Sequence, residues 1–363
     1  MTRTARALGT LAAVSLAAPV LAPTTASAAQ LPQGWPKGLQ IGVADQPGGA
    51  AALKREAPFA FRYQYLAGGA NTGAGWATWN PNGTFVSRYV RESRAAGMIP
   101  VFTYYQLLQS APAVGGGEDE KDLSNLRNED TMRAYWKDFR LFLQRAKGKG
   151  LVVAHLEPDM WGYLQQHGEA GLARRYAQRA VRLRDRVARN VQLAWHLSVW
   201  GTKEDPTYSE PPVAHMRVLA RRSAAFFRRS GGHELDLVFL DVEDRDAGFN
   251  QVINGDSRSA WDAEDFARNT AYVESFTRRV DRPLVIWQIP LGNSTLPNEW
   301  ERFRDSRVEW WLGDRERLAR DARAGVAALL FGGGADGTTS PQTDGGLFFR
   351  LARRYYEQGV VSR

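Results

Sequence analysis

Short runs of apolar residues alternate along the chain with longer segments of helical apolar spacing. Short apolar runs are typical of buried strands, and recurrence every three to four positions is typical of amphipathic helices. Eight segments fit the strand pattern: Leu39–Asp45, Phe59–Leu66, Met98–Tyr105, Leu151–Glu157, Val191–Val199, Leu235–Glu243, Pro283–Ile289 and Val326–Phe331. Helices are predicted within Ala50–Ala57 and over Phe85–Ala96, Thr131–Lys147, Ala170–Arg189, Pro212–Arg229, Ala263–Val280, Arg315–Ala324 and Phe348–Gln358.

Strands that alternate with helices predict a parallel sheet, and eight such units predict a closed barrel. We therefore predict an α/β fold, a single-domain (β/α)8 TIM-type barrel, over residues 29–363. A doubly wound open sheet is the alternative, but no glycine-rich nucleotide turn follows the first strand. Val308–Leu312 is a candidate extra strand, and residues 115–121 are predicted as a surface loop able to act as a lid.

Residues 1–28 have the three parts of a secretory signal peptide. Arg3 and Arg6 form a basic start, Ala7–Ala22 is apolar, and residues 26–28 (Ala-Ser-Ala) form a small-residue cleavage site. A retained membrane anchor is the alternative, but the apolar stretch is short for a span. We predict a secreted, extracellular protein with no membrane span after cleavage.

The 363 residues include no cysteine, which excludes disulfides, thiol catalysis and thiolate metal sites. The formal net charge is +8, and 40 of the 47 basic residues are arginine. Many of the arginines lie on one predicted helix: Arg174, Arg175, Arg179, Arg182, Arg184, Arg186 and Arg189. We interpret them as a solvated helix face, and weak adhesion to an anionic cell-wall polymer is the alternative. No nucleic-acid-binding motif accompanies the charge, so we expect no nucleic-acid partner.

Polar and aromatic residues gather where the predicted strands end, and this is where TIM barrels hold their active sites. Aromatic rings offer stacking faces for sugars, and amides and histidines hydrogen-bond to sugar hydroxyls. The candidate substrate-binding residues are Asp45, Tyr63, Tyr65, Tyr105, His155, Trp161, His196, Trp200, Trp287 and Gln288. Trp161, Trp200 and Trp287 have an alternative role as core residues.

Strand parity selects a smaller group among these strand ends. Alternate residues of a strand share a face, and a purely apolar face belongs against the outer helices. This rule predicts that His155, Glu157, His196, Asp241 and Glu243 point into the barrel.

Paired carboxylates are what glycoside hydrolysis requires, because one protonates the leaving oxygen and the other attacks carbon or activates water. We predict Glu157 as the acid/base, with Glu243 or Asp241 as its partner. Structural ion pairing is the alternative for all three carboxylates, and capping of the next helix is the alternative for Asp159. The two histidines are interpreted as hydrogen-bonding residues, and the acids near Asp241 lack EF-hand spacing.

Two segments resemble motifs of family 6 cellulases. Glu157-Pro158-Asp159 resembles that family's Glu-Pro-Asp motif, which implies that Asp159 is a general acid. Residues 333–338 (Gly-Gly-Ala-Asp-Gly-Thr) resemble a later segment of the family, which implies that Asp336 is a catalytic base or an orienting acid. The chain also resembles secreted barrel glycosidases with a Glu at the end of the fourth strand. Their seventh-strand Glu is replaced here by Trp287-Gln288, so the second carboxylate is expected from the sixth or eighth strand.

These features predict a secreted glycoside hydrolase that cleaves O-glycosidic bonds in a polysaccharide or oligosaccharide without a cofactor or metal. A non-catalytic carbohydrate-binding barrel of the cell envelope is one alternative. The other is a metal-dependent hydrolase with His155, Glu157, His196 and Asp241 as ligands.

Overall fold

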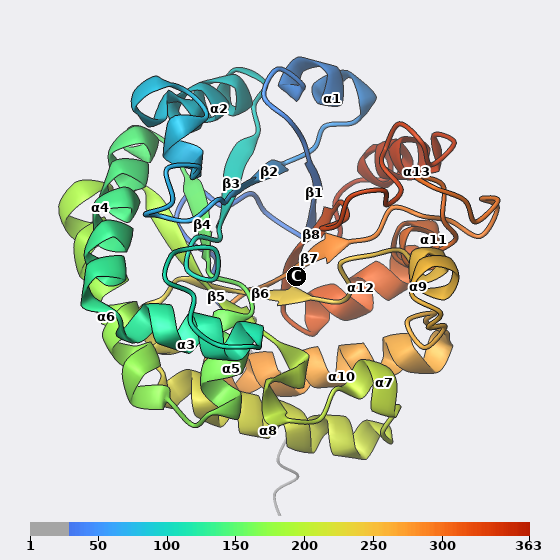
Figure 1. Ribbon diagram of the computed structural model, residues 1–363. Helices are drawn as coiled ribbons and strands as arrows, with labels where there is room; N and C mark the ends of the chain where they lie inside the picture. The colour runs from blue at the N-terminus through green and yellow to red at the C-terminus, as the bar shows by residue number, and fades with distance from the viewer. Residues whose placement is uncertain (1–28) are drawn as a thin grey trace, which may run out of the picture.

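The computed structural model describes residues 29–363, and a closed barrel of eight parallel strands lies at its centre, ringed by helices (Figure 1). The predicted signal peptide, residues 1–28, lies outside the described residues. The strands are β1 (Gln40–Ala44), β2 (Phe61–Leu66), β3 (Ile99–Tyr104), β4 (Val152–Leu156), β5 (Val191–Leu197), β6 (Leu237–Asp241), β7 (Leu284–Ile289) and β8 (Val326–Phe331). All eight predicted strands and the single-domain (β/α)8 architecture are confirmed.

Each strand pairs in parallel with the next, and β8 pairs with β1 to close the barrel. The eight predicted helices are present as α1 (Ala50–Glu56), α2 (Thr84–Ala95), α4 (Glu129–Ala146), α6 (Ala170–Val187), α8 (Val213–Arg229), α10 (Ala263–Val280), α12 (Arg315–Arg323) and α13 (Leu347–Glu357). Five further helices lie in the connections: α3 (Glu118–Arg127), α5 (Met160–Gln166), α7 (Pro206–Ser209), α9 (Ala247–Ile253) and α11 (Arg307–Gly313).

Two local expectations are wrong, one of them in part. The candidate extra strand lies inside α11, because Val308, Trp311 and Leu312 recur at helical spacing and bury one helix face. The predicted surface loop is correct for residues 115–117, but residues 118–121 belong to α3, which begins at Glu118. The acidic residues that follow Gly117 stabilise a helix N-terminus through its dipole.

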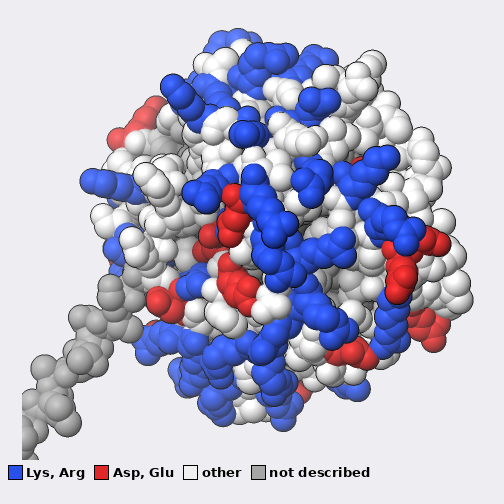
Figure 2. Space-filling view, turned by 90° about the vertical axis from the view of Figure 1, so that its left-hand side faces the viewer, with Lys and Arg blue, Asp and Glu red and all other residues white. Residues whose placement is uncertain are grey.

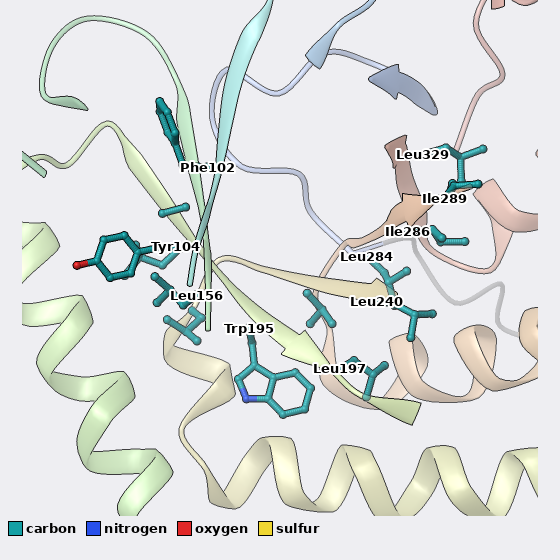
Figure 3. Close-up of a cluster of buried hydrophobic side chains, with 14 of the residues drawn as sticks. Phe102, Tyr104, Leu156, Trp195, Leu197, Leu240, Leu284, Ile286, Ile289 and Leu329 are labelled. Carbon is teal, nitrogen blue, oxygen red and sulfur yellow. The ribbon is translucent and has the colours of Figure 1, made fainter. Parts of the chain in front are cut away.

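The core has two layers that follow strand parity. One face of each strand packs on the helices, as Phe102, Leu156 and Trp195 do (Figure 3). The other face fills the barrel interior with residues such as Val153 and Phe239. This alternation places His155 and His196 inside the barrel. No helix within residues 29–363 is long and apolar enough to cross a membrane.

Candidate active site

A pocket of about 380 Å³ opens where β4, β5, β6 and β7 end. The acidic residues that line it are Asp159, Asp205, Asp241, Glu243 and Asp244. The aromatic and imidazole rings that line it are Tyr65, Tyr105, His196, Trp200, Tyr208 and Trp287. Carboxylates and rings therefore share one concave site at the end of the barrel that carries active sites in this fold.

Asp159 reaches this pocket through an unusual backbone conformation. Its φ of 62° and ψ of −48° are costly for a non-glycine residue, and such strain concentrates at functional sites. The hydroxyl of Tyr105 donates to Asp159 Oδ2 over 3.3 Å. The side chain of Asp159 makes no cap hydrogen bond to α5, so the helix-capping interpretation of this residue is wrong. Burial raises the pKa of Asp159 to about 6, and the negative charge of Asp241 also raises it.

A line of polar groups inside the barrel leads to Asp241. Thr103 Oγ1 lies 3.3 Å from His155 Nδ1, and His155 Nε2 lies 2.9 Å from His196 Nδ1. His196 Nε2 then lies 3.3 Å from Asp241 Oδ1. In one arrangement of protons along this line, Thr103 donates to His155, His155 donates to His196, and His196 directs its Nε2–H at Asp241.

The surroundings of the two imidazoles are compatible with this arrangement. Burial lowers the pKa of His155 well below its usual value, and the neighbouring His196 lowers it further, so His155 is neutral. The ring of His155 stacks on Phe239 and meets the edge of Trp287, which fixes its orientation. His196 Nε2 and Asp241 Oδ1 make no well-directed hydrogen bond in the described chain, so both are available to a ligand hydroxyl.

Glu243 and Asp244 form a second acidic group on the same wall. The amide of Asp244 donates to Glu243 Oε1 over 3.0 Å, and Arg245 forms an ion pair with Asp244. Burial raises the pKa of Glu243 to about 8, against the lowering effect of Arg307, and the neighbouring Asp244 raises it further. Glu243 is therefore protonated at neutral pH and can donate a hydrogen bond into the pocket.

The ends of β2 and β7 form an aromatic wall. The ring centroids of Tyr65 and Trp287 lie 5.7 Å apart, and Gln288 donates its amide N–H to the Tyr65 hydroxyl. Gln288 also has a positive φ, of 60°, so it is the second residue at the pocket, after Asp159, whose backbone is strained for a residue other than glycine. The indole N–H of Trp287 is buried without a partner in the described chain. The rings of Tyr65 and Trp287 therefore line the pocket as a wall against which a sugar could pack.

Glu157 does not point into the barrel, so the parity prediction for it is wrong. β4 ends at Leu156, and a φ of 40° at Glu157 turns its side chain away from the pocket. Its carboxylate accepts hydrogen bonds from the amides of Gln106 and Leu107, at 3.1 to 3.2 Å, on the helix side of the barrel. Burial raises its pKa to about 7. Its catalytic role stays a prediction that this geometry does not favour.

Apart from Glu157 and His155, four predicted residues lie outside the pocket lining. Asp45 forms a 2.7 Å ion pair with the buried Arg62, and the hydroxyl of Tyr63 donates to the carbonyl of Gly332 inside the barrel. Trp161 is fully buried between barrel and helices and donates to the carbonyl of Leu156. Asp336 is exposed on the segment after β8. The contacts of the first three are those of packing residues.

The residues of the metal-ligand alternative are not brought together. His155 and His196 bond to each other, and Glu157 lies on the other side of the strand layer. Within residues 29–363, no group of three or more histidine or carboxylate side chains is arranged to hold a metal ion.

Asp205 and Tyr208 line the pocket but were not among the predicted site residues. Both lie between β5 and α8, in a connection that runs from Ser198 to Pro212. Connections of this length between a strand and a helix are often functional. The length of this connection is therefore the one signal in the sequence that indicates them.

No protein-family model and no curated protein sequence matches this chain. Solved structures do resemble it. GH26C from Muricauda sp. has a TM-score of 0.57 at 9% identity, over 90% of this chain and 87% of that chain. A GH26 β-mannanase from Bacteroides ovatus has a TM-score of 0.56 at 13% identity, over 90% of both chains. A modular endo-β-1,4-mannanase from Cellulomonas fimi has a TM-score of 0.54 at 11% identity, over 87% and 70%.

At these identities the similarity establishes the barrel fold. The resemblance to family 6 cellulases is not supported, since these structures are described as glycoside hydrolases of family 26. Asp159 and Asp336 also do not line a common pocket. The two aspartates are kept apart because residues 333–338 fold into a turn that leaves Asp336 in solvent.

Proposed function

We propose that this protein is a glycoside hydrolase that uses Asp159 as general acid and Asp241 as the second carboxylate. The main support for this proposal is that the two carboxylates line one pocket but lie in different environments. Asp159 is buried with a raised pKa, and Asp241 lies 3.3 Å from the Nε2 atom of His196. Titratable pairs whose environments separate their protonation states are typical of acid/base catalysis. The solved structures with the same fold act on glycans according to their names, which supports this reaction class.

In this mechanism Asp159 donates its proton to the glycosidic oxygen as the bond breaks. Tyr105 holds the carboxyl by donating to Oδ2, so the other oxygen is the one that carries the proton. Asp241 stabilises the oxocarbenium-like transition state with its negative charge. It either attacks the anomeric carbon to form a glycosyl ester that water then hydrolyses, or takes a proton from the water that attacks this carbon. The imidazole line places His196 Nε2 at 3.3 Å from Asp241 Oδ1, where it can support a negative charge on this carboxylate.

The rings around the carboxylates are proposed to bind the sugars, and β-1,4-linked mannan is the first substrate to test. This choice follows the two mannanases that share the fold. The test is release of new reducing ends from mannan, xylan, cellulose and galactan by the purified protein. Binding of one polysaccharide without any product would favour the carbohydrate-binding alternative instead. The signal-type sequence of residues 1–28 supports secretion, which N-terminal sequencing of protein from culture medium would test.

The first prediction concerns pH. A general acid must be protonated, and the pKa of Asp159 is raised to about 6. We expect kcat/KM to fall about tenfold per pH unit above this value, because the protonated fraction falls at that rate. A profile of kcat/KM against pH measures this fall, which forms the basic limb of the profile. If the basic limb instead lies near 8, the value to which burial raises the pKa of Glu243, then Glu243 and not Asp159 is the acid.

The second prediction concerns sugar stacking. The ring of Trp200 lines the pocket and packs against the ring of Tyr163, with a distance of 5.0 Å between the two centroids. We expect Trp200→Ala to raise KM about three- to tenfold with little change in kcat, because an aromatic face contributes about 0.5–1.5 kcal/mol. Trp79→Ala is the matched control, since this ring is exposed and lies outside the pocket. An equal rise in KM for both variants would contradict the assignment.

A further inference from the structure

The outer face of α6 carries a row of arginines that the proposed reaction does not use. Arg175, Arg179, Arg182 and Arg186 follow one another at helical spacing, so they lie along one face. All four are exposed. At the rise of a helix, the row is roughly 16 Å long. Figure 2 faces the side of the molecule where α4 and α6 lie, and Lys and Arg gather there in a broad band.

One end of this row borders a groove of about 440 Å³ between α4 and α6. Its apolar lining includes Trp136 and Tyr176, which are buried. The charged residues that line it are Arg127, Glu129, Arg133, Arg175 and Arg179, so four arginines face one carboxylate. The Arg179 guanidinium lies over the Trp136 ring at 4.9 Å from its centroid, so its position is fixed without a carboxylate.

The charges on this face are only partly balanced. Arg127 forms an ion pair with Glu169, and Arg133 forms one with Asp130. Within residues 29–363, the four arginines of the α6 row form no ion pair with a carboxylate. Burial and the charge of Arg182 lower the pKa of Arg179, so the neighbouring charges repel one another. A ligand with regularly spaced negative charges would relieve this repulsion.

We propose that the groove and the α6 row together bind an extended carboxylated polysaccharide. A guanidinium donates two parallel hydrogen bonds to a carboxylate, and a row of guanidinium groups fits a chain with repeated acidic sugars. The choice of a polysaccharide rests on the proposed function of the pocket. A single glycan with both neutral and acidic sugars could bind the pocket and the α6 row at once. The binding of a polyanion rests on the arginines alone.

Two other polyanions fit this face less well. Single-stranded nucleic acid binds through exposed rings on which bases stack, but Trp136 and Tyr176 are buried here. A membrane surface would require apolar side chains that insert beside the charges. The exposed large hydrophobic residues of the described chain lie elsewhere: Trp79, Val114, Tyr208, Val213, Val252, Ile253 and Trp300.

The test is binding of the full chain to polygalacturonate, measured by isothermal titration at low and high salt. We expect Arg179→Glu/Arg182→Glu to weaken binding at least about tenfold, since two charges become repulsive. Arg323→Glu/Arg354→Glu is the control, because it makes the same charge change at exposed positions on α12 and α13. Binding by the wild type is expected to weaken strongly at high salt.

Equal weakening in both double variants, or none in the α6 variant, would overturn the proposal. Stronger binding of the wild type to single-stranded RNA or to phosphatidylglycerol vesicles than to polygalacturonate would also overturn it. Asp241→Asn separates this site from the pocket. We expect that variant to bind polygalacturonate like the wild type, whether or not the proposed hydrolysis is correct.

Discussion

Asp241→Asn and Asp159→Asn are each expected to lower kcat about 10²- to 10⁴-fold on whichever glycan the wild type cleaves, the range typical of a lost acid or base. Asparagine has nearly the shape of aspartate but can neither carry the proton nor hold the charge. For Asp241, the amide also removes the carboxylate toward which His196 directs its ring nitrogen at 3.3 Å. Substrate affinity is expected to change little, because the rings of the pocket stay in place.

Steady-state kinetics give the loss in kcat, and titration of the inactive variants with an oligosaccharide gives their affinity. Asp336→Asn is the matched control, since it makes the same chemical change at an exposed position. We expect it to keep wild-type activity. The assignment fails if Glu157→Gln abolishes activity in a folded protein while both aspartate variants keep theirs. The family 6-like scheme would instead require a large loss in Asp336→Asn.

The barrel could be predicted from the sequence because its signal is repeated. Each strand is a short apolar run, each main helix has apolar residues at helical spacing, and the errors at element ends are small. The five additional helices were not predicted, because most are too short to show a period. α5 and α9 have seven residues each, which is about two turns.

Strand parity predicted the interior correctly where the backbone stays extended. His155 and His196 lie inside the barrel, as their positions in β4 and β5 imply. Parity failed at Glu157, one residue beyond the strand. Nothing in the sequence indicates the positive φ there, and the proline at 158 favours extended backbone before it. Because of this turn, Asp159 lines the pocket that was predicted to hold Glu157, and Glu157 points away from it.

The gathering of the pocket acids could be predicted only in part. Asp241 is the last residue of β6 and Glu243 lies two residues further on, so the position of this strand predicted both. Asp205 comes from a long connection whose path depends on packing against its neighbours, which one sequence does not reveal. The distribution of roles among the acids depends on burial, since burial is what raises the pKa of Asp159 and Glu243.

Glu157→Ala is expected to lower the free energy of unfolding by about 2–5 kcal/mol. The buried carboxylate accepts from the amides of Gln106 and Leu107, and alanine would leave both donors unpaired and a small cavity beside them. Glu157→Gln keeps one oxygen acceptor and nearly the same volume, so its loss is expected to be smaller. Urea denaturation at pH 5 measures both variants against the wild type.

The same carboxyl makes a second, pH-dependent contribution. Burial raises its pKa from 4.5 to about 7, so the folded state holds the proton more tightly than the unfolded chain. Its stabilising contribution is complete below the unfolded value and is lost as pH rises through about 7. The shift corresponds to about 3 kcal/mol. The stability of the wild type relative to Glu157→Gln should therefore fall by about this amount between pH 4 and pH 8. A constant difference would show that the carboxyl titrates in the folded state as it does in the unfolded chain, and would contradict the raised pKa that burial causes at Glu157.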